Sequence, residues 1–199
     1  MSVPAPPAPP AARLWLVRHA AALVGPGICY GALDLPADAT ATRSAAARLA
    51  AALPSQPRVF HSPLQRCAQL ALELQARRPD ARSRPDARLR EMDFGAWEGR
   101  AWKAIGKGPI DAWTAAFTIH APGGGERLGA LLARVSAALQ AARQLHAEQG
   151  VADVVWITHA GVARCVAWLQ AHGDGPLPRC GEWPVAAPGC GGWELRVLA

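Results

Sequence analysis

The strongest constraint on the fold is the alternation of short apolar segments with longer helical ones. Residues 14–17, 58–61 and 154–158 have the length and the Val, Ile, Trp and Phe content of buried strands. The stretches between and after them are rich in Ala, Leu and Arg and are expected to form helices. These helices are predicted at residues 42–53, 64–78, 128–149 and 162–171. Strands that alternate with helices favour an α/β fold with a largely parallel sheet.

Local signals set several element boundaries. Ser62 followed by Pro63 is a helix-start pattern, because serine can cap free N–H groups and proline suits the first helical position. Gly150 is expected to end the long helix before it, since glycine tolerates the left-handed conformation found there. Residues 84–90 are predicted to be a third extended segment.

Two regions contain many glycines and prolines. Residues 97–117 are expected to be irregular or short-helical, with breaks at Gly106, Gly108 and Pro109. The C-terminal stretch from residue 174 is predicted to hold two short strands, at residues 183–186 and 193–198.

The length of 199 residues suits one domain, predicted over residues 13–199. Residues 1–12 are rich in Pro and Ala and are expected to form a disordered or extended tail. No apolar run reaches the roughly 18 residues that span a bilayer, so no membrane partner is predicted.

The net charge of +6 comes from 21 basic and 15 acidic residues. The basic residues are scattered and form no block of five, which argues against nucleic acid as a partner. A few well-placed arginines are better suited to a small anionic substrate.

The five cysteines are widely spaced and form no CxxC or Cys/His pair at the spacing of a zinc site. Reduced thiols and a cytoplasmic location are therefore expected, with no metal and no cofactor. The sequence leaves open whether the chain is a monomer or a homodimer.

Polar residues follow the predicted strands at the point where each strand ends. Arg18 and His19 end the first strand, Arg66 follows the second, Glu91 follows the third extended segment, and His159 ends the strand at 154–158. Ligands of open α/β sheets bind at the carboxyl ends of the strands. We therefore expect these five side chains to converge at one edge of the sheet.

This set of side chains fits one kind of chemistry. A neutral imidazole is a nucleophile near neutral pH, and arginine forks hold phosphate oxygens bidentately. A carboxylic acid can protonate a departing alkoxide. Helix N-termini near Pro63 and Gly161 would add N–H donors for an anion. Together these groups predict phosphoryl transfer through a phosphohistidine, without a metal.

Four ordered segments resemble signatures of the histidine phosphatase superfamily, which has the phosphoglycerate mutase-like fold. LWLVRHA at 14–20 resembles LxxxRHG, and SPLQRCAQ at 62–69 resembles SxLxRxxxT. LREMDFGAWEG at 89–99 resembles LxExxFGxWEG, and THAG at 158–161 resembles the SHGG or THGG block. The resemblance implies a three-layer α/β/α sandwich with a mostly parallel central sheet.

The resemblance also implies a role for each matched residue. His19 would be the phosphorylated nucleophile, and Arg18 and Arg66 would clamp the phosphoryl group. His159, with Ala160 and Gly161, would bind that group from the other side. Glu91 would be the general acid toward the leaving group and then the base for water.

The chain departs from the family pattern at several positions. Ala20 and Ala160 replace glycines, and Ala21, Ala22 and Leu23 stand where the family usually has Glu-Thr and Asn. The Asn often contacts phosphate, so one donor is lost or is supplied elsewhere. Activity is still expected, because the charged residues of the motifs are intact.

The short interval between Gly99 and Pro122 favours a phosphatase over a mutase, since mutases of this family usually carry an insertion there. CYGALDLP at 29–36 resembles a stretch of short bacterial members assigned as α-ribazole phosphatases. The expected substrate is a small phosphorylated metabolite, with α-ribazole 5′-phosphate as one candidate. A phosphoglycerate mutase-type transferase and an inactive binding protein with the same fold are the alternatives.

Other assignments of single residues stay open. Asp93 or Glu98 could replace Glu91 as the acid, and His61 lies next to the predicted site without matching a motif. A metal-dependent hydrolase could use His19, His61, His159, Glu91 and Asp93, but no local ligand pair supports it and the paired arginines would oppose a cation. Because the acid must be protonated and the nucleophile neutral, a mildly acidic optimum of roughly pH 5–7 is expected.

Overall fold

One sheet organises the part of the chain that the computed structural model describes, residues 12–198. Its five strands follow the order β3-β2-β4-β1-β5. The first four of them run parallel, and the last pairs antiparallel with β1. They are β1 (Arg13–Arg18), β2 (Arg58–His61), β3 (Ser83–Pro85), β4 (Asp153–Thr158) and β5 (Trp193–Val197).

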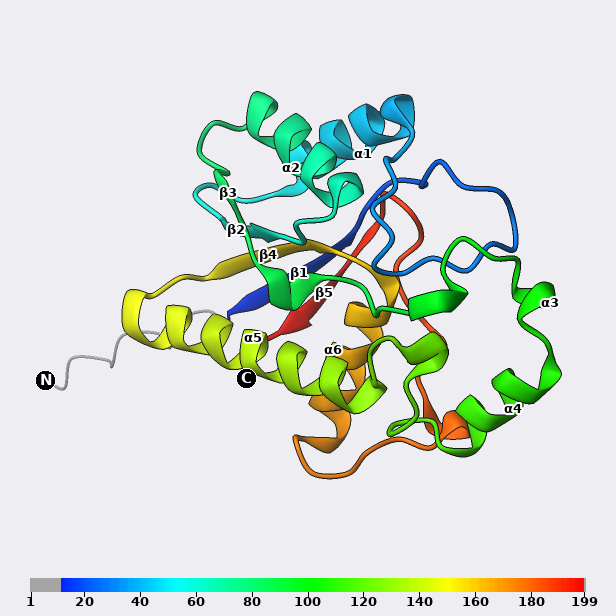
Figure 1. The fold of residues 1–199 in the computed structure, drawn as a ribbon. Helices are drawn as coiled ribbons and strands as arrows, with labels where there is room; N and C mark the ends of the chain where they lie inside the picture. Colours follow the sequence, from blue (N-terminus) through cyan, green and yellow to red (C-terminus); the bar gives the residue numbers. More distant parts are fainter. Residues whose placement is uncertain (1–11, 199) are drawn as a thin grey trace, which may run out of the picture.

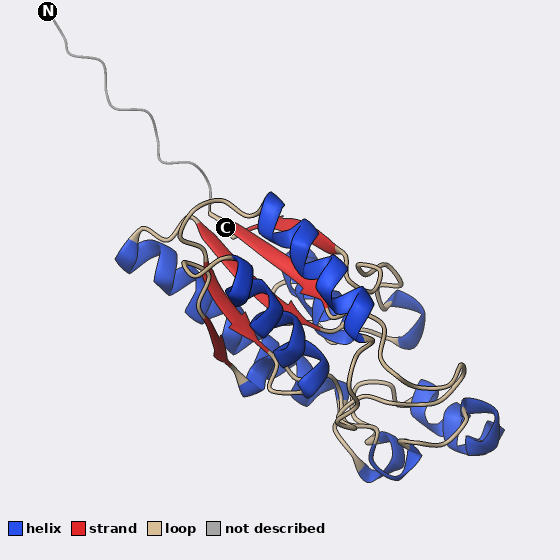
Figure 2. Cartoon of the chain, turned by 90° about the horizontal axis from the view of Figure 1, so that it is seen from above, coloured by secondary structure: helices blue, strands red, loops and turns tan. Residues whose placement is uncertain are grey.

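Helices cover both faces of the sheet, as Figures 1 and 2 show. α1 (Ala39–Ala52) and α2 (Gln65–Arg77) lie on one face. α5 (Leu128–Gln149) and α6 (Ala160–His172) lie on the other. The predicted three-layer α/β/α sandwich with a mostly parallel sheet is confirmed.

The two central strands divide the core between the faces. In β1, Leu14 and Leu16 pack on the α5–α6 side, while Trp15 and Val17 pack on the α1–α2 side. Every residue of β4 is buried. A strand that is covered on both faces needs apolar residues throughout, which explains the continuous apolar run that predicted β4.

One predicted helix end is confirmed, and one predicted helix start is shifted. α5 spans the predicted residues 128–149, and Gly150 follows it in the left-handed conformation, with φ 66°. α1 begins three residues earlier than expected, because the Asp38 carboxylate accepts a hydrogen bond from the Ala41 N–H and caps the helix there.

Three local predictions were wrong. Ser62 and Pro63 do not begin α2, which starts at Gln65 with Leu64 as its cap residue. The Ser62 hydroxyl hydrogen-bonds His159 at 2.8 Å and accepts only a long bond from the Leu64 N–H, at 3.4 Å. Gly108 and Pro109 lie in the first turn of α4 (Lys107–Ala115), where proline's missing N–H costs nothing, so only Gly106 breaks the segment.

The predicted strand at residues 183–186 was also wrong. This stretch follows a 3₁₀ turn, η4 (Cys180–Glu182), and has no strand partner, because β5 already occupies the sheet edge beside β1. Pro184 within it has no N–H to donate to a ladder. The segment predicted over 84–90 is extended only in β3 and then forms the 3₁₀ turn η1 (Ala87–Leu89).

The remaining elements lie beyond the carboxyl ends of the strands. They are the helix α3 (Trp102–Ile105), the helix α4, and the 3₁₀ turns η2 (Gly95–Trp97) and η3 (Pro122–Gly124). In Figure 1, α3 and α4 stand apart from the three layers. Short helices over residues 97–117 agree with the sequence.

Ala12, which the sequence placed in the tail, is the first described residue. Residues 1–11, most of the predicted tail, lie outside the described residues. Ala12 is buried, and its carbonyl accepts a hydrogen bond from the Leu198 N–H. Within residues 12–198, no helix is both long enough and apolar enough to cross a membrane.

Candidate active site

The residues that end the strands meet at one edge of the sheet. Arg18, His19, Arg66 and Glu91 all line a cavity of about 590 Å³, together with Ala160 and Gly161 at the start of α6. His159 does not line this cavity; it is buried next to His19, with 5.0 Å between the ring centroids. The structure therefore brings together all seven residues that the sequence singled out.

His19 is a neutral imidazole whose two ring nitrogens have different partners: Nδ1 faces a hydrogen-bond acceptor and Nε2 faces a donor. Its Nδ1 lies 2.6 Å from the Ala20 carbonyl oxygen, and Arg66 Nε donates to its Nε2 at 3.3 Å. Nδ1 therefore carries the proton and Nε2 has the lone pair. Burial, with help from the charges of Arg66 and Arg18, lowers the pKa of His19 to about 3.

Arg66 is a fully buried cation. Its Nη1 and Nη2 donate to the carbonyl oxygens of Leu33 and Gly31, at 2.9 and 2.6 Å. The Tyr30 ring lies 5.5 Å from the guanidinium carbon. These contacts fix the side chain and leave its charge without a carboxylate partner among the described residues.

Arg18 lies beside His19 at the end of β1. One terminal nitrogen donates to the Pro188 carbonyl oxygen at 3.1 Å, and its buried Nε has no partner within residues 12–198. No ion pair to a carboxylate is formed by Arg18 in that range either. Two arginines without counter-charges make this end of the cavity a site for an anion.

His159 sits behind the cavity in a polar contact with Ser62. The two side chains are 2.8 Å apart at Nε2 and Oγ, and the Cys67 sulfur lies 3.5 Å from the same nitrogen. Burial and the neighbouring cations lower the pKa of His159 well below its ordinary value. Its Nδ1 has no hydrogen-bond partner in the described part of the chain.

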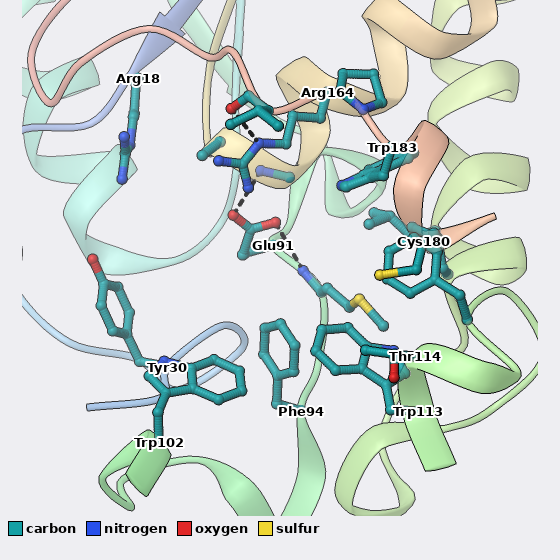
Figure 3. Close-up of a pocket in the computed structure, with 18 of the residues that line it drawn as sticks. Arg18, Tyr30, Glu91, Phe94, Trp102, Trp113, Thr114, Arg164, Cys180 and Trp183 are labelled. Carbon is teal, nitrogen blue, oxygen red and sulfur yellow. Dashed lines mark hydrogen bonds between the residues drawn. The ribbon is translucent and has the colours of Figure 1, made fainter. Parts of the chain in front are cut away.

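Glu91 rests on the N-terminus of α6. The Gly161 N–H donates to one carboxylate oxygen at 3.0 Å, and the Met92 N–H donates to the other at 3.1 Å. Figure 3 shows this carboxylate inside the cavity, near Arg164. A Cβ at position 161 would lie only 2.1 Å from the Glu91 carboxylate, so this contact requires glycine.

A second arginine network supports the backbone around Glu91 from outside the cavity. Arg134 on α5 donates to the carbonyl oxygens of Arg88, Arg90 and Glu91, at 2.7, 2.6 and 3.2 Å. Glu126 holds the same guanidinium bidentately, at 2.7 and 2.8 Å. Glu126 therefore acts through Arg134 and does not line the 590 Å³ cavity.

The alternative acids and the extra histidine do not reach the cavity. Glu98 accepts hydrogen bonds from the N–H groups of Ala32, Leu33 and Phe94, which fastens two loops together. Asp93 is exposed, and its carboxylate accepts from the Gly95 N–H. His61 hydrogen-bonds the Ser83 hydroxyl at 2.6 Å.

The N-terminus of α2 differs from its predicted role as an anion donor. The Gln65 N–H donates to the Asp34 carboxylate at 2.7 Å, so this donor is already occupied. No cluster of three or more His, Cys, Asp or Glu that could hold a metal ion occurs in residues 12–198.

Sequence reasoning missed Arg164 and the aromatic side of the cavity. Arg164 lies on α6, one helical turn after Ala160, so i,i+4 spacing could have placed it on the same face. Its Nε donates to the Val185 carbonyl oxygen at 3.2 Å. Trp102 and Trp113 belong to α3 and α4, whose position no motif indicates.

A comparison with protein families matches residues 14–183 to the histidine phosphatase superfamily, branch 1. The chain belongs to this superfamily. The match contains all the motif residues around the cavity, and it makes the protein a phosphatase. A comparison with curated proteins finds no significant match.

Solved structures of related proteins agree with the family. Mycobacterial glucosyl-3-phosphoglycerate phosphatase is 25% identical, with a TM-score of 0.73 over 93% of this chain and 89% of that one. A Thermus thermophilus protein, TTHB049, is 32% identical, with a TM-score of 0.65 over 92% of each chain. "Mycobacterial hydrolase 1" is 25% identical, with a TM-score of 0.75 over 93% of this histidine phosphatase and 88% of that chain.

Proposed function

We propose that this histidine phosphatase is a metal-independent phosphomonoesterase that uses His19 as its nucleophile and acts on a small phosphorylated metabolite. The observation that carries the proposal is the state of His19: buried, neutral, with the lone pair on Nε2, beside two arginines that have no carboxylate partner within residues 12–198. This is the arrangement that nucleophilic attack on a bound phosphate dianion needs.

In the first half-reaction, the His19 Nε2 lone pair forms a bond to phosphorus and the bond from phosphorus to the leaving oxygen breaks. Glu91 gives its proton to that oxygen, so the product leaves as an alcohol. Arg18 and Arg66 hold the phosphoryl oxygens. His159 Nδ1, which has no hydrogen-bond partner within residues 12–198, makes a hydrogen bond to a phosphoryl oxygen from the side opposite the arginines.

In the second half-reaction, Glu91 takes a proton from water while the water oxygen attacks phosphorus. The N–P bond breaks, inorganic phosphate leaves, and the electron pair returns to His19 Nε2. The protonated Glu91 is then ready for the next substrate, so the cycle consumes only water and phosphomonoester.

The substrate proposal rests on the family resemblance and on the neighbours. The loop at residues 29–36 suggests α-ribazole 5′-phosphate as one member of a substrate screen, and the mycobacterial neighbour suggests phosphorylated sugar acids as another.

All five cysteines are free thiols, which supports a reducing compartment such as the cytoplasm.

The test is phosphate release from p-nitrophenyl phosphate in the presence of EDTA. Wild type should be active, and His19→Ala should lose at least about 1,000-fold in kcat, because no covalent intermediate can form. Phosphate trapped on the wild-type chain by rapid acid-free denaturation should map to His19. His61→Ala is the matched control, since His61 lies next to the sheet edge but outside the cavity.

Retention of more than about a tenth of the wild-type rate in His19→Ala, or loss of activity in EDTA, would refute the proposal. Transfer of the trapped phosphate to a second phosphorylated metabolite rather than to water would make the protein a mutase-type transferase instead.

A further inference from the structure

The cavity has a charged half and an aromatic half. In Figure 3, Arg18, Arg164 and Glu91 lie in one half, and Phe94, Trp102 and Trp113 lie in the other. The charged side chains that line the cavity are those of Arg18, Arg66, Glu91 and Arg164, and the neutral nucleophile His19 lies among them. The phosphoryl group belongs beside these groups, so the body of the leaving group must extend toward the rings.

The aromatic half is a wall of rings that hold one another in place. Trp102 and Trp113 are nearly parallel, at 12° with 6.4 Å between centroids. Phe94 contacts both edge-on, at 84° and 86° and at centroid distances of 5.5 and 5.9 Å. Edge-to-face geometry of this kind is favourable, so the wall is preformed rather than assembled around a ligand.

The wall has uncharged donors only at a few points. Among the described residues that line the cavity, these donors are the O–H or S–H groups of Tyr30, Thr114 and Cys180 and the indole N–H groups of Trp102, Trp113 and Trp183, of which Trp113 Nε1 is buried with no partner within residues 12–198. A polyol or sugar acid placed here would replace only part of the hydrogen bonds that it loses to water. A planar apolar group would instead bury its surface against the rings and stack on them.

We infer that the preferred substrates are phosphomonoesters whose alcohol carries an aromatic ring, and that Trp102 is a specificity-determining residue for that ring. The inference rests on the proposed function, since it concerns the leaving group of the same reaction. It distinguishes this chain from a phosphatase of sugar acids such as the mycobacterial neighbour.

Trp102 is the best residue for a test because it lines the cavity yet is 36% exposed, so its replacement removes little of the core. Trp193 is a matched control. It packs on Trp15 at the edge of the sheet, with 6.4 Å between centroids, and lies outside the cavity.

The experiment compares kcat/KM for benzyl phosphate, glycerol 1-phosphate and 3-phosphoglycerate. All three have alkoxide leaving groups, so intrinsic reactivity differs less than with a phenol ester. Wild type should prefer benzyl phosphate at least about tenfold over either polar ester. Trp102→Ala should reduce that ratio by about tenfold, Trp102→Phe should keep most of it, and Trp193→Ala should leave it unchanged.

Equal or greater kcat/KM for glycerol 1-phosphate or 3-phosphoglycerate would overturn the aromatic preference and leave the phosphatase proposal intact. An unchanged ratio in Trp102→Ala would overturn the role of Trp102. Failure to hydrolyse any of the three esters or p-nitrophenyl phosphate, with no phosphohistidine formed, would overturn both proposals.

Discussion

The contact between Gly161 and Glu91 leads to a sharp prediction for Gly161→Ala. A Cβ at this position would lie 2.1 Å from Glu91 Oε1 and 3.0 Å from its carboxyl carbon. Side-chain carbons almost never come within 3.0 Å of another heavy atom, so the oxygen must move by at least about 0.9 Å. Oε1 then leaves the Met92 N–H, and the turn of the carboxylate weakens the bond from the Gly161 N–H to Oε2 and shifts the group from its position in the cavity.

A misplacement of about 1 Å in a reacting group can cost on the order of 100-fold in rate. The loss should depend on the leaving group. The quantity to compare is kcat/KM, because it covers only the steps up to release of the leaving group, whereas kcat also contains the hydrolysis of the phosphohistidine, in which Glu91 is the base for both esters. Benzyl alkoxide needs the proton from Glu91, so kcat/KM for benzyl phosphate should fall about 100-fold. p-Nitrophenolate is stable without protonation, so kcat/KM for its phosphate ester should fall less than about tenfold.

The free energy of unfolding of Gly161→Ala should be about 0.5–2 kcal/mol below that of wild type. Alanine favours a helix over glycine by about 1 kcal/mol, while the lost hydrogen bonds to a carboxylate cost about 1.5–3 kcal/mol. Gly108→Ala is the matched control. Gly108 is the second residue of α4, as Gly161 is of α6, and a Cβ there would meet nothing within 4 Å.

Steady-state kinetics of the two esters with wild type, Gly161→Ala and Gly108→Ala would decide the matter. An equal fall in kcat/KM for both esters, or no fall for benzyl phosphate, would show that Glu91 is not the proton donor that the leaving group needs.

Two further outcomes follow from the site. His19 has an ordinary pKa near 6.5 in the unfolded chain and about 3 when folded, so the unfolded state binds its proton first as the pH falls. Between about pH 7 and pH 5, urea unfolding of wild type should therefore lose about 2 kcal/mol more stability than that of His19→Asn; equal losses would refute this. Arg134→Lys cannot keep both the Glu126 fork and the carbonyl contacts around Glu91. We expect kcat for benzyl phosphate to fall about tenfold with KM nearly unchanged, and a rise in KM alone would contradict a positioning role.

The low pKa of His19 also refines the expected pH profile. Because His19 stays neutral down to about pH 3, its protonation does not limit kcat/KM in the range from about pH 5 to 7. A fall of kcat/KM between about pH 7 and 5 should therefore come from protonation of the substrate phosphate dianion, whose second pKa is about 6, and its midpoint should move with the pKa of the ester that is used.

Several features of the fold could be predicted from sequence because their causes are local. Continuous apolar residues identified β1 and β4, since strands covered on both faces bury every side chain. Gly150 marked the end of α5 through its left-handed backbone. The motif residues could be placed at one edge because parallel strands carry their ends to the same side.

Other features depend on partners that are distant in sequence. Ser62 has the local pattern of a helix cap, but a histidine 97 residues away takes its hydroxyl. The segment at 183–186 contains strand-forming residues but has no free sheet edge to join beside β1. Glu126 is two residues before α5 in the sequence, and only its pairing with Arg134 shows that it supports the Glu91 backbone.

The sequence alone determined the fold class and the set of groups at the sheet edge, because both follow from local patterning and from strand direction. The tertiary structure decided the state of each group and the shape of the cavity around it. Three features arise only when distant segments exclude water together. They are the desolvation of His19, the charges of Arg18 and Arg66 without carboxylate partners in residues 12–198, and the wall of Phe94, Trp102 and Trp113. Such effects depend on distances through space, which no spacing along the chain encodes.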